Sequence, residues 1–224
     1  MNTRQQQYLS AMGIPAWVQR DAEPITDPVE ESPVGGDVVP AWELLERQVS
    51  ACTLCALHTS RTQTVFGVGS KQAQLLVIGE APGAEEDRRG EPFVGRAGQL
   101  LTAMLKAIDL PRETVYIANV LKCRPPNNRD PDPAEAETCT AYLQRQIDLL
   151  QPKLILAVGR IAGQWLTGSS APLGKLRLGS YTYGKGNVPL LVTYHPAYLL
   201  RSPGQKRLAW EDLKRARELL GAHK

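Results

Sequence analysis

Four cysteines constrain the fold of this 224-residue chain more than any other feature. Cys52 and Cys55 form a C-x2-C pair ahead of the first apolar run, whereas Cys123 and Cys139 come much later in the chain. Because no cysteine is left over, the pattern predicts one site of four thiolates that ties the start of the domain to a loop and a helix in its middle. Structural zinc and iron–sulfur clusters both accept four thiolates, so the cysteines alone leave both open.

The composition is typical of a globular protein. Hydrophobic residues make up 42% of the chain and charged residues 22%, and no apolar run approaches the ~20 residues that span a bilayer. The N-terminus lacks the basic and apolar regions of a signal peptide. We therefore expect a cytoplasmic protein without membrane contact, in which clustered cysteines indicate metal binding or catalysis rather than disulfides.

The first 40 residues differ from the rest in charge and in their content of proline and glycine. They carry two basic and six acidic residues, whereas residues 41–224 carry 24 basic and 17 acidic residues. Residues 21–40 are rich in proline, glycine and acids, which predicts a flexible linker. The apolar pattern of residues 7–18 predicts either a docking peptide or a peptide that folds back on its own domain. The stretch is weakly similar to the N-terminal peptide of the psi subunit of the bacterial clamp loader (L-x-x-x-G-I-x-x-W), which implies a replication or repair protein as the partner. The basic excess after residue 40 suits a polyanionic partner but is also common in proteins that never bind nucleic acid.

Short apolar runs alternate with helical patterns from residue 41 onward, which predicts an α/β domain over residues 41–224. Such alternation argues for a mainly parallel sheet with helices on both faces. The predicted strands are 74–79, 114–121, 153–159 and 189–195, and the predicted helices are 41–50, 97–108, 133–150, 160–168 and 205–221.

The strands end in unusual loops, at residues 79–83, 119–128, 159–160 and 195–201. Ligands of parallel sheets bind at these carboxyl ends. An amide such as Asn119 suits the edge of a base, although it also suits a turn cap. His195 follows an apolar strand, and Phe93 lies in a loop where a base could stack on it. Leu199 beside Arg201 suits an apolar wedge in a nucleic-acid stack, with a buried leucine as the alternative.

Taken in order, C-x2-C, GEAPG, EPFVGRAGQLL, NVLKCRPPNNRDP and HPAYLLR resemble the family-4 uracil-DNA glycosylases over about residues 45–220. The resemblance implies a three-layer α/β/α sandwich around a four-stranded parallel sheet. It implies a [4Fe–4S] cluster on Cys52, Cys55, Cys123 and Cys139, with zinc as the chemical alternative. It also implies hydrolysis of the N-glycosidic bond of uracil in single- or double-stranded DNA, and a monomer.

The resemblance also implies roles for single residues. Phe93 would stack on the flipped uracil, Asn119 would bind its Watson–Crick edge, and His195 would face its O2. Supporting contributions come from Glu80, Glu86 and Asn128 and from the backbone N–H of Ala81. Lys122, Arg124 and Arg129 flank the third cysteine and suit phosphate contact.

Ala81 stands where the best-known branch of the superfamily has an aspartate that activates water. We therefore expect a dissociative mechanism with a poorly activated water and no stable covalent adduct. Gly83 replaces a tyrosine that excludes thymine in that branch. Two other readings remain open: a non-catalytic nucleic-acid-binding module with an iron–sulfur or zinc staple, and a zinc-stapled interaction domain.

Overall fold

Six strands form one mixed sheet within residues 40–221, the part of the chain that the computed structural model describes. Its four central strands are parallel and lie in the order β3 (Tyr116–Asn119), β2 (Leu75–Gly79), β4 (Leu154–Val158) and β6 (Val188–Thr193). The predicted parallel strands are thereby confirmed. Two antiparallel edge strands, β1 (Val68–Gly69) and β5 (Tyr181–Tyr183), were not predicted, because they are too short and too exposed to show an apolar pattern.

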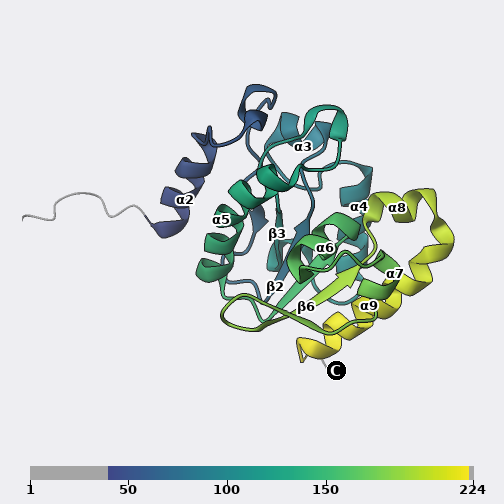
Figure 1. Ribbon diagram of the computed structural model, residues 1–224. Helices are drawn as coiled ribbons and strands as arrows, with labels where there is room; N and C mark the ends of the chain where they lie inside the picture. Colours follow the sequence, from purple (N-terminus) through teal and green to yellow (C-terminus); the bar gives the residue numbers. More distant parts are fainter. Residues whose placement is uncertain (1–39, 222–224) are drawn as a thin grey trace, which may run out of the picture. The chain divides into compact units, whose positions relative to one another are not determined.

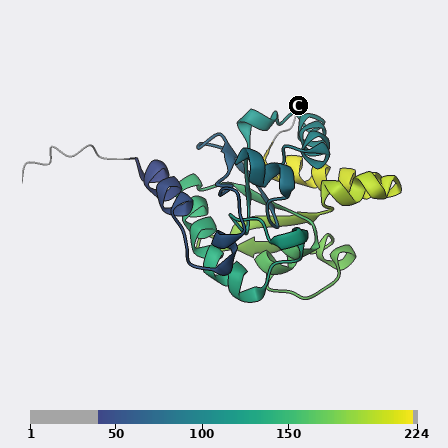
Figure 2. The ribbon, with the colours of Figure 1, turned by 90° about the horizontal axis from the view of Figure 1, so that it is seen from above.

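Helices cover both faces of the sheet, which confirms the three layers (Figures 1 and 2). The main helices are α2 (Ala41–Ser50), α3 (Ala84–Arg89), α4 (Arg96–Lys106), α5 (Pro133–Leu150), α6 (Arg160–Thr167), α7 (Leu173–Leu176), α8 (Pro196–Arg201) and α9 (Lys206–Leu219). Short 3-10 turns lie at Ala56–Thr59, Arg112–Thr114, Pro126–Asn128 and Pro203–Gln205.

Alternate residues of β2 point into two separate cores, because successive side chains of a strand face opposite sides of the sheet. Leu76 and Ile78 belong to the core that α5 and α6 cover. Leu75 and Val77 belong to the core that α4 and α9 cover. Every residue of β2 is therefore buried, which explains why its run of sequence is apolar throughout.

Local sequence sets the ends of α5, which joins the cysteine-rich side of the domain to the sheet. Pro133 occupies the first turn, where a missing N–H costs no hydrogen bond. The backbone N–H of Asp132 donates to the Glu135 carboxylate at 3.0 Å. The helix runs to Leu150, as the apolar pattern predicts.

Residues 195–201, expected as a loop, instead contain helix α8. His195 is its N-cap and Pro196 occupies its first position, which favours helix initiation. The segment is short, and the proline after His195 suggested a turn rather than a helix start. This difference decides which side chains of the segment face the core.

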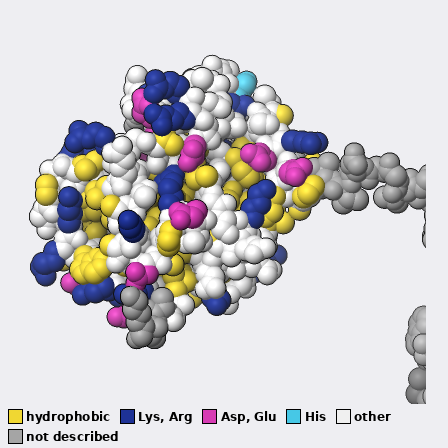
Figure 3. Space-filling model, turned by 180° about the vertical axis from the view of Figure 1, so that it is seen from behind, with side chains coloured by type: hydrophobic (Ala, Val, Ile, Leu, Met, Phe, Trp, Pro, Cys, Tyr) yellow, Lys and Arg dark blue, Asp and Glu magenta, His cyan; other side chains and the backbone are white. Residues whose placement is uncertain are grey.

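The expected docking peptide at residues 7–18 and the linker up to residue 39 lie outside the described residues. Among helices within residues 40–221, none is both long and apolar enough to cross a membrane. Figure 3 shows Lys and Arg side chains spread over one face of the molecule, with acidic and apolar side chains between them.

Candidate active site

The carboxyl ends of the parallel strands meet at one cavity of about 470 Å³. Gly79 and Asn119 end β2 and β3, and His195 lies two residues beyond β6. The cavity is lined by the predicted residues Glu80, Ala81, Glu86, Phe93, Asn119, Asn128, His195 and Arg201. The structure therefore brings these side chains, which are far apart in sequence, to one place, while their individual roles stay predictions.

Asn119 presents a buried oxygen without a partner at the wall of this cavity. The side chain is 2% exposed, and its Oδ1 has no hydrogen-bond partner within residues 40–221. A Cβ on the neighbouring Gly79 would lie 2.3 Å from this oxygen and 2.8 Å from Cζ of Phe93. Only glycine therefore lets the amide and the ring approach each other. An unpaired buried polar atom costs about 1–3 kcal/mol of folding free energy, so native proteins rarely contain one. A buried oxygen without a partner is therefore expected to be paired by a ligand.

The loop that carries Phe93 is held in an unusual backbone conformation. Phe93 has a φ of 55°, in the left-handed region that bulky residues rarely adopt. Oε1 of Glu86 accepts the backbone N–H of Val94 at 3.0 Å, which fixes the loop just after Phe93. The Phe93 and His195 rings lie 5.6 Å apart at an angle of 32°. Glu86 thus holds the loop that carries Phe93, its role toward the substrate stays a prediction, and two aromatic rings form one side of the cavity.

His195 is neutral, and its geometry fixes which ring nitrogen carries the proton. Nδ1 lies 3.1 Å from the backbone N–H of Ala197 and accepts from it, so the hydrogen of the neutral ring lies on Nε2. Burial, the largest contribution, and the positive charge of Arg201 together lower the pKa of His195 to about 4, with Glu86 partly opposing the shift. At neutral pH the ring therefore offers one N–H donor.

Glu80 is a carboxyl group with a disturbed pKa at the boundary of the cavity. Burial, the largest contribution, and the negative charge of Asp130 together raise its pKa to about 7, with Arg160 opposing the shift. Arg160 donates to Oδ2 of Asp130 at 3.0 Å, and both side chains are largely exposed. Asp130 and Arg160 were not predicted as site residues. Asp130 lies within the motif NVLKCRPPNNRDP and Arg160 within the strand-end loop at 159–160, so the sequence indicated the segments but not these side chains.

Asn128 and its neighbours hold the loop after β3 on the opposite side of the cavity. Nε of Arg124 donates to Oδ1 of Asn128 at 2.8 Å. Arg129 donates to both carboxylate oxygens of Glu135, at 2.9 and 2.6 Å. These two arginines are thus partly engaged within the protein, although Arg129 remains exposed and lines the cavity.

Lys122, expected to contact phosphate, is instead 1% exposed, so that prediction is wrong. Its Nζ donates to the backbone carbonyl of Asn119 at 2.9 Å and to Oε1 of Gln146 at 2.6 Å. Its backbone N–H donates to Sγ of Cys139 at 3.2 Å. The chain turns inward after β3, which places this side chain between the strand and α5 rather than at the surface. Lys122 therefore links the cysteine region to the strand end that carries Asn119.

Leu199 is 1% exposed and packs in the core with residues of α4 and α9, so the expectation of an exposed wedge at this position is wrong. The physical reason is that the segment is helical, and Leu199 lies on the inner face of α8. Leu200, the next residue, is 36% exposed. The alternative of a buried leucine thus holds for Leu199.

The four cysteines lie within electrostatic range of one another, near the start of the loop after β3: the charges of Cys55 and Cys52 act on Cys123, and those of Cys123 and Cys55 act on Cys139. Cys123 and Cys139 are buried, whereas Cys52 and Cys55 are half-buried, and none forms a disulfide. Burial, the largest contribution, and the charges of Cys123 and Cys55 raise the pKa of Cys139 to about 11, while Lys122 opposes the shift. Arg61 donates to Sγ of Cys123 at 3.0 Å. Within residues 40–221, however, no three or more Cys, His, Asp or Glu side chains form a group compact enough to hold a metal ion.

Comparisons with known proteins agree with this geometry. The model of the uracil DNA glycosylase superfamily matches residues 66–214. A type-4 uracil-DNA glycosylase from Archaeoglobus fulgidus is 45% identical over 183 residues, covering 78% of this chain and 91% of that protein. One from Thermotoga maritima is 41% identical over 181 residues, covering 80% and 94%.

A DNA polymerase of Bacillus phage SP01 is also similar, at 30% identity over 156 residues that make up 69% of this chain but 16% of that protein. The type-4 relatives, in contrast, match over most of their own length and at higher identity. The family predicted from the motifs is thereby confirmed. The chain belongs to the type-4 branch of the uracil-DNA glycosylase superfamily.

Proposed function

We propose that this chain is an enzyme that hydrolyses the N-glycosidic bond of uracil in DNA and leaves an abasic site. The observation that carries the proposal is the buried, unpaired Oδ1 of Asn119 in a cavity that Phe93 and His195 also line. An amide matches the Watson–Crick edge of uracil, because its oxygen accepts the base N–H and its NH2 donates to the base carbonyl. The type-4 relatives support the same conclusion.

Uracil has to leave the base stack to reach such a cavity. Extrusion costs a few kcal/mol, which binding in the cavity has to offset. The Phe93 ring offers a stacking surface, and the left-handed backbone held by Glu86 keeps that ring in place before DNA binds. A preformed ring loses little conformational freedom on binding, so most of the stacking energy is available to stabilise the extruded base.

Bond cleavage places negative charge on the departing uracil and positive charge on the sugar. The Nε2–H of neutral His195 suits a hydrogen bond to the uracil O2, where that negative charge develops. The backbone N–H of Ala81 suits a second contact to the base. Removing one donor of this kind typically lowers the rate by about 100- to 1,000-fold. Because His195 stays neutral, the stabilisation comes from a fixed dipole and not from a full positive charge.

The sugar cation needs a negative neighbour and a water molecule. Glu80 is one candidate, since its carboxyl group lines the cavity and is partly ionised at neutral pH. A carboxylate with this pKa stabilises a cation, orients water and is well matched to general-base catalysis near neutral pH. We propose a dissociative mechanism without a stable covalent adduct because Ala81 supplies no carboxylate for the water, and a Glu80 variant tests whether Glu80 takes that part. In a single-turnover assay Glu80→Gln lowers the rate less than about 1,000-fold; a larger loss indicates that the carboxylate activates the water directly.

A [4Fe–4S] cluster on Cys52, Cys55, Cys123 and Cys139 is the second part of the proposal. The donor chemistry fits, because none of the four thiols is in a disulfide, burial and the charges of Cys55 and Cys52 raise the pKa of Cys123, and the sulfurs of Cys123 and Cys139 accept hydrogen bonds from Arg61 and from the Lys122 backbone. The cluster would supply a covalent staple between the start of the domain and the loop after β3. Brown protein with visible absorption that dithionite bleaches supports it, whereas colourless protein with one zinc per chain supports the alternative.

The decisive experiment measures base release from a single-stranded oligonucleotide that contains one uracil, followed by alkaline cleavage. Asn119→Ala and His195→Ala should each lower the single-turnover rate by at least 100-fold. Gln144→Ala removes an amide on the outer surface of α5 and serves as the matched control with an unchanged rate. No cleavage by protein that binds the oligonucleotide would overturn the proposed activity and favour a non-catalytic binding module.

Residues 7–18 are proposed to dock on a replication or repair protein, and the glycosylase itself to act as a cytoplasmic monomer. The chain without residues 1–39 should then release uracil from free DNA at an unchanged rate. A monomeric mass in light scattering for both forms is expected, and a dimer would contradict the second part.

A further inference from the structure

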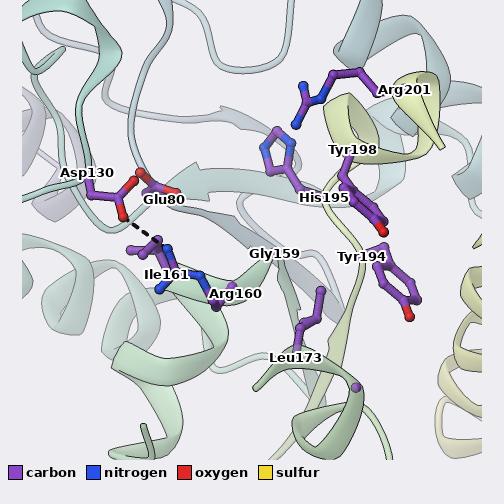
Figure 4. A pocket seen from close by; sticks show the side chains of 11 residues that line it. Glu80, Asp130, Gly159, Arg160, Ile161, Leu173, Tyr194, His195, Tyr198 and Arg201 are labelled. Atoms are coloured by element: carbon purple, nitrogen blue, oxygen red, sulfur yellow. Dashed lines mark hydrogen bonds and ion pairs between the residues drawn. The ribbon is translucent and has the colours of Figure 1, made fainter. Parts of the chain in front are cut away.

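A second cavity, of about 580 Å³, continues from the one that the proposed uracil contacts occupy. The two share Glu80, Asp130, His195 and Arg201, so they open into each other around the histidine. The proposed contacts to uracil all lie in the first cavity. The second extends along the start of α6, the start of α7 and helix α8 (Figure 4).

One wall of this second cavity is a stack of flat side chains. The rings of Tyr194 and Tyr198 lie 5.4 Å apart at an angle of 13°, side by side in Figure 4. The guanidinium of Arg177 lies 4.8 Å from the centre of the Tyr194 ring. Arg177 and Tyr198 thus both pack against the Tyr194 ring. Arg177 is buried, whereas Tyr198 lines the cavity and is 36% exposed, so Tyr198 is the member of the stack that a ligand can reach.

The inner end of the stack is anchored in the protein. Arg177 is 5% exposed and donates to both carboxylate oxygens of Asp212, each at 2.7 Å. Asp212 also accepts from the hydroxyl of Thr193 at 2.7 Å, which ties the anchor to the end of β6. A bidentate arginine–carboxylate pair has a fixed geometry. The tyrosine stack is consequently rigid before any ligand binds.

The other walls suit a nucleotide. Leu173 and Ile161 lie across the cavity from the tyrosines and supply apolar surface (Figure 4). Arg160 and Arg201 are exposed at the cavity and carry positive charge suitable for phosphate. Aromatic platforms combined with cations are the usual means of binding single-stranded nucleic acid, because each base has a π-face and each nucleotide a phosphate.

We propose that this second cavity holds the nucleotide next to the extruded uridine in the same strand, with its base stacked on Tyr198. The inference rests on the proposed function, since it takes the first cavity as the uracil site. It adds a base-stacking subsite that is indifferent to sequence. It also predicts that a base on one side of the uracil contributes to binding.

The first test is a double-mutant cycle that combines a substitution at Tyr198 with a missing base in the substrate. Single-stranded oligonucleotides carry one uracil with normal neighbours, with an abasic spacer on its 5′ side, or with the spacer on its 3′ side. Tyr198→Ala should lower kcat/KM on the normal strand by about 5- to 150-fold, whereas Tyr198→Phe keeps the ring and changes it less than about threefold. Wild-type protein should lose a similar factor with one of the two spacers, and Tyr198→Ala should lose nothing further with that spacer.

If the losses from Tyr198→Ala and from the spacer multiply instead, the base does not stack on Tyr198 and the proposal is overturned. The same holds if Tyr198→Ala acts like wild type on the normal strand. Since Tyr198 is on the surface, thermal unfolding of both variants should match wild type. If Tyr198→Ala alone lowers the melting temperature, its activity also reflects a less stable fold. The binding measurement then decides whether the base stacks on Tyr198.

That measurement does not depend on catalysis. A strand with 2-aminopurine beside a 2′-fluoro uridine, which resists cleavage, is titrated with each protein. Quenching of the 2-aminopurine by wild type and Tyr198→Phe, but not by Tyr198→Ala, supports the subsite even if no protein releases uracil. Uracil release together with equal quenching by all three proteins retains the proposed function and overturns the subsite.

Discussion

Replacing Asn119 with leucine should make the protein more stable and much less active. Oδ1 of Asn119 is buried without a partner, and such an atom costs about 1–3 kcal/mol. Leucine has a similar size but no polar atoms, so Asn119→Leu removes this cost. Some of the gain is lost because the new side chain must fit against Gly79 and Phe93, which already lie close. We expect a net gain of about 1 kcal/mol in the free energy of unfolding.

For a domain of this size, about 1 kcal/mol corresponds to a rise of about 2–4 °C in melting temperature. The uracil release rate should fall by about 100- to 10,000-fold, because the polar edge of the bound base would then be buried without partners. Melting is followed by circular dichroism at one scan rate, and activity by single-turnover release from a uracil-containing strand.

Gln146→Leu is the matched control, because it removes a buried amide that is fully paired. Its Nε2 donates to the backbone carbonyl of Phe66 at 2.9 Å, and its Oε1 accepts from Lys122 at 2.6 Å. Breaking both bonds should lower the melting temperature by at least about 4 °C. If Asn119→Leu lowers it by a similar amount, the Asn119 amide is paired in the free protein and the reasoning from its unpaired oxygen fails.

Four further predictions come from other parts of the structure. With a raised pKa of about 7, Glu80 is protonated at acid pH, so kcat/KM should rise up to pH 7 and then level; Glu80→Gln should abolish this inflection. A neutral His195 adds no inflection above pH 5, and one near pH 6.5 that His195→Gln removes would contradict its lowered pKa. Leu199→Ala should lower the free energy of unfolding by about 2–5 kcal/mol in urea titrations, and Leu200→Ala by less than about 1 kcal/mol, with equal losses counting against the burial of Leu199. Arg61→Leu removes the hydrogen-bond donor to Cys123, so the visible absorption of the proposed [4Fe–4S] cluster should bleach faster in air in this variant than in wild type. Equal bleaching shows that the arginine does not protect the cysteine site.

Most strands and helices could be predicted from the hydrophobic periodicity of the sequence. The central strands are so fully buried that their apolar runs are visible without any neighbour, and helices such as α5 have an apolar pattern long enough to be read alone. The sequence did not predict the edge strands β1 and β5 or the short helix α8. Each is only two to six residues long, and its conformation depends on the partner it packs against.

The candidate site was predictable only as a set of residues. Because parallel strands align their carboxyl ends, loops after β2, β3 and β6 had to meet, and Asn119 and His195 were identified on that ground. Which neighbours complete the site was not predictable: Arg160 and Tyr198 lie in the strand-end loops at 159–160 and 195–201, but the sequence does not show which side chains of those loops face the cavity. Lys122 and Leu199 show the limit clearly, because the direction of a side chain depends on a turn or helix whose geometry is set by distant contacts.

The amino-acid sequence by itself determined the layers of this protein, its family and the residue types of its site, since these follow from periodicity, motif order and strand direction. Only the tertiary structure decided the protonation of His195, the pKa of Glu80 and the unpaired state of Asn119. Those properties depend on burial and on the exact positions of a few dipoles and charges, and these arise only when segments distant in the chain pack together.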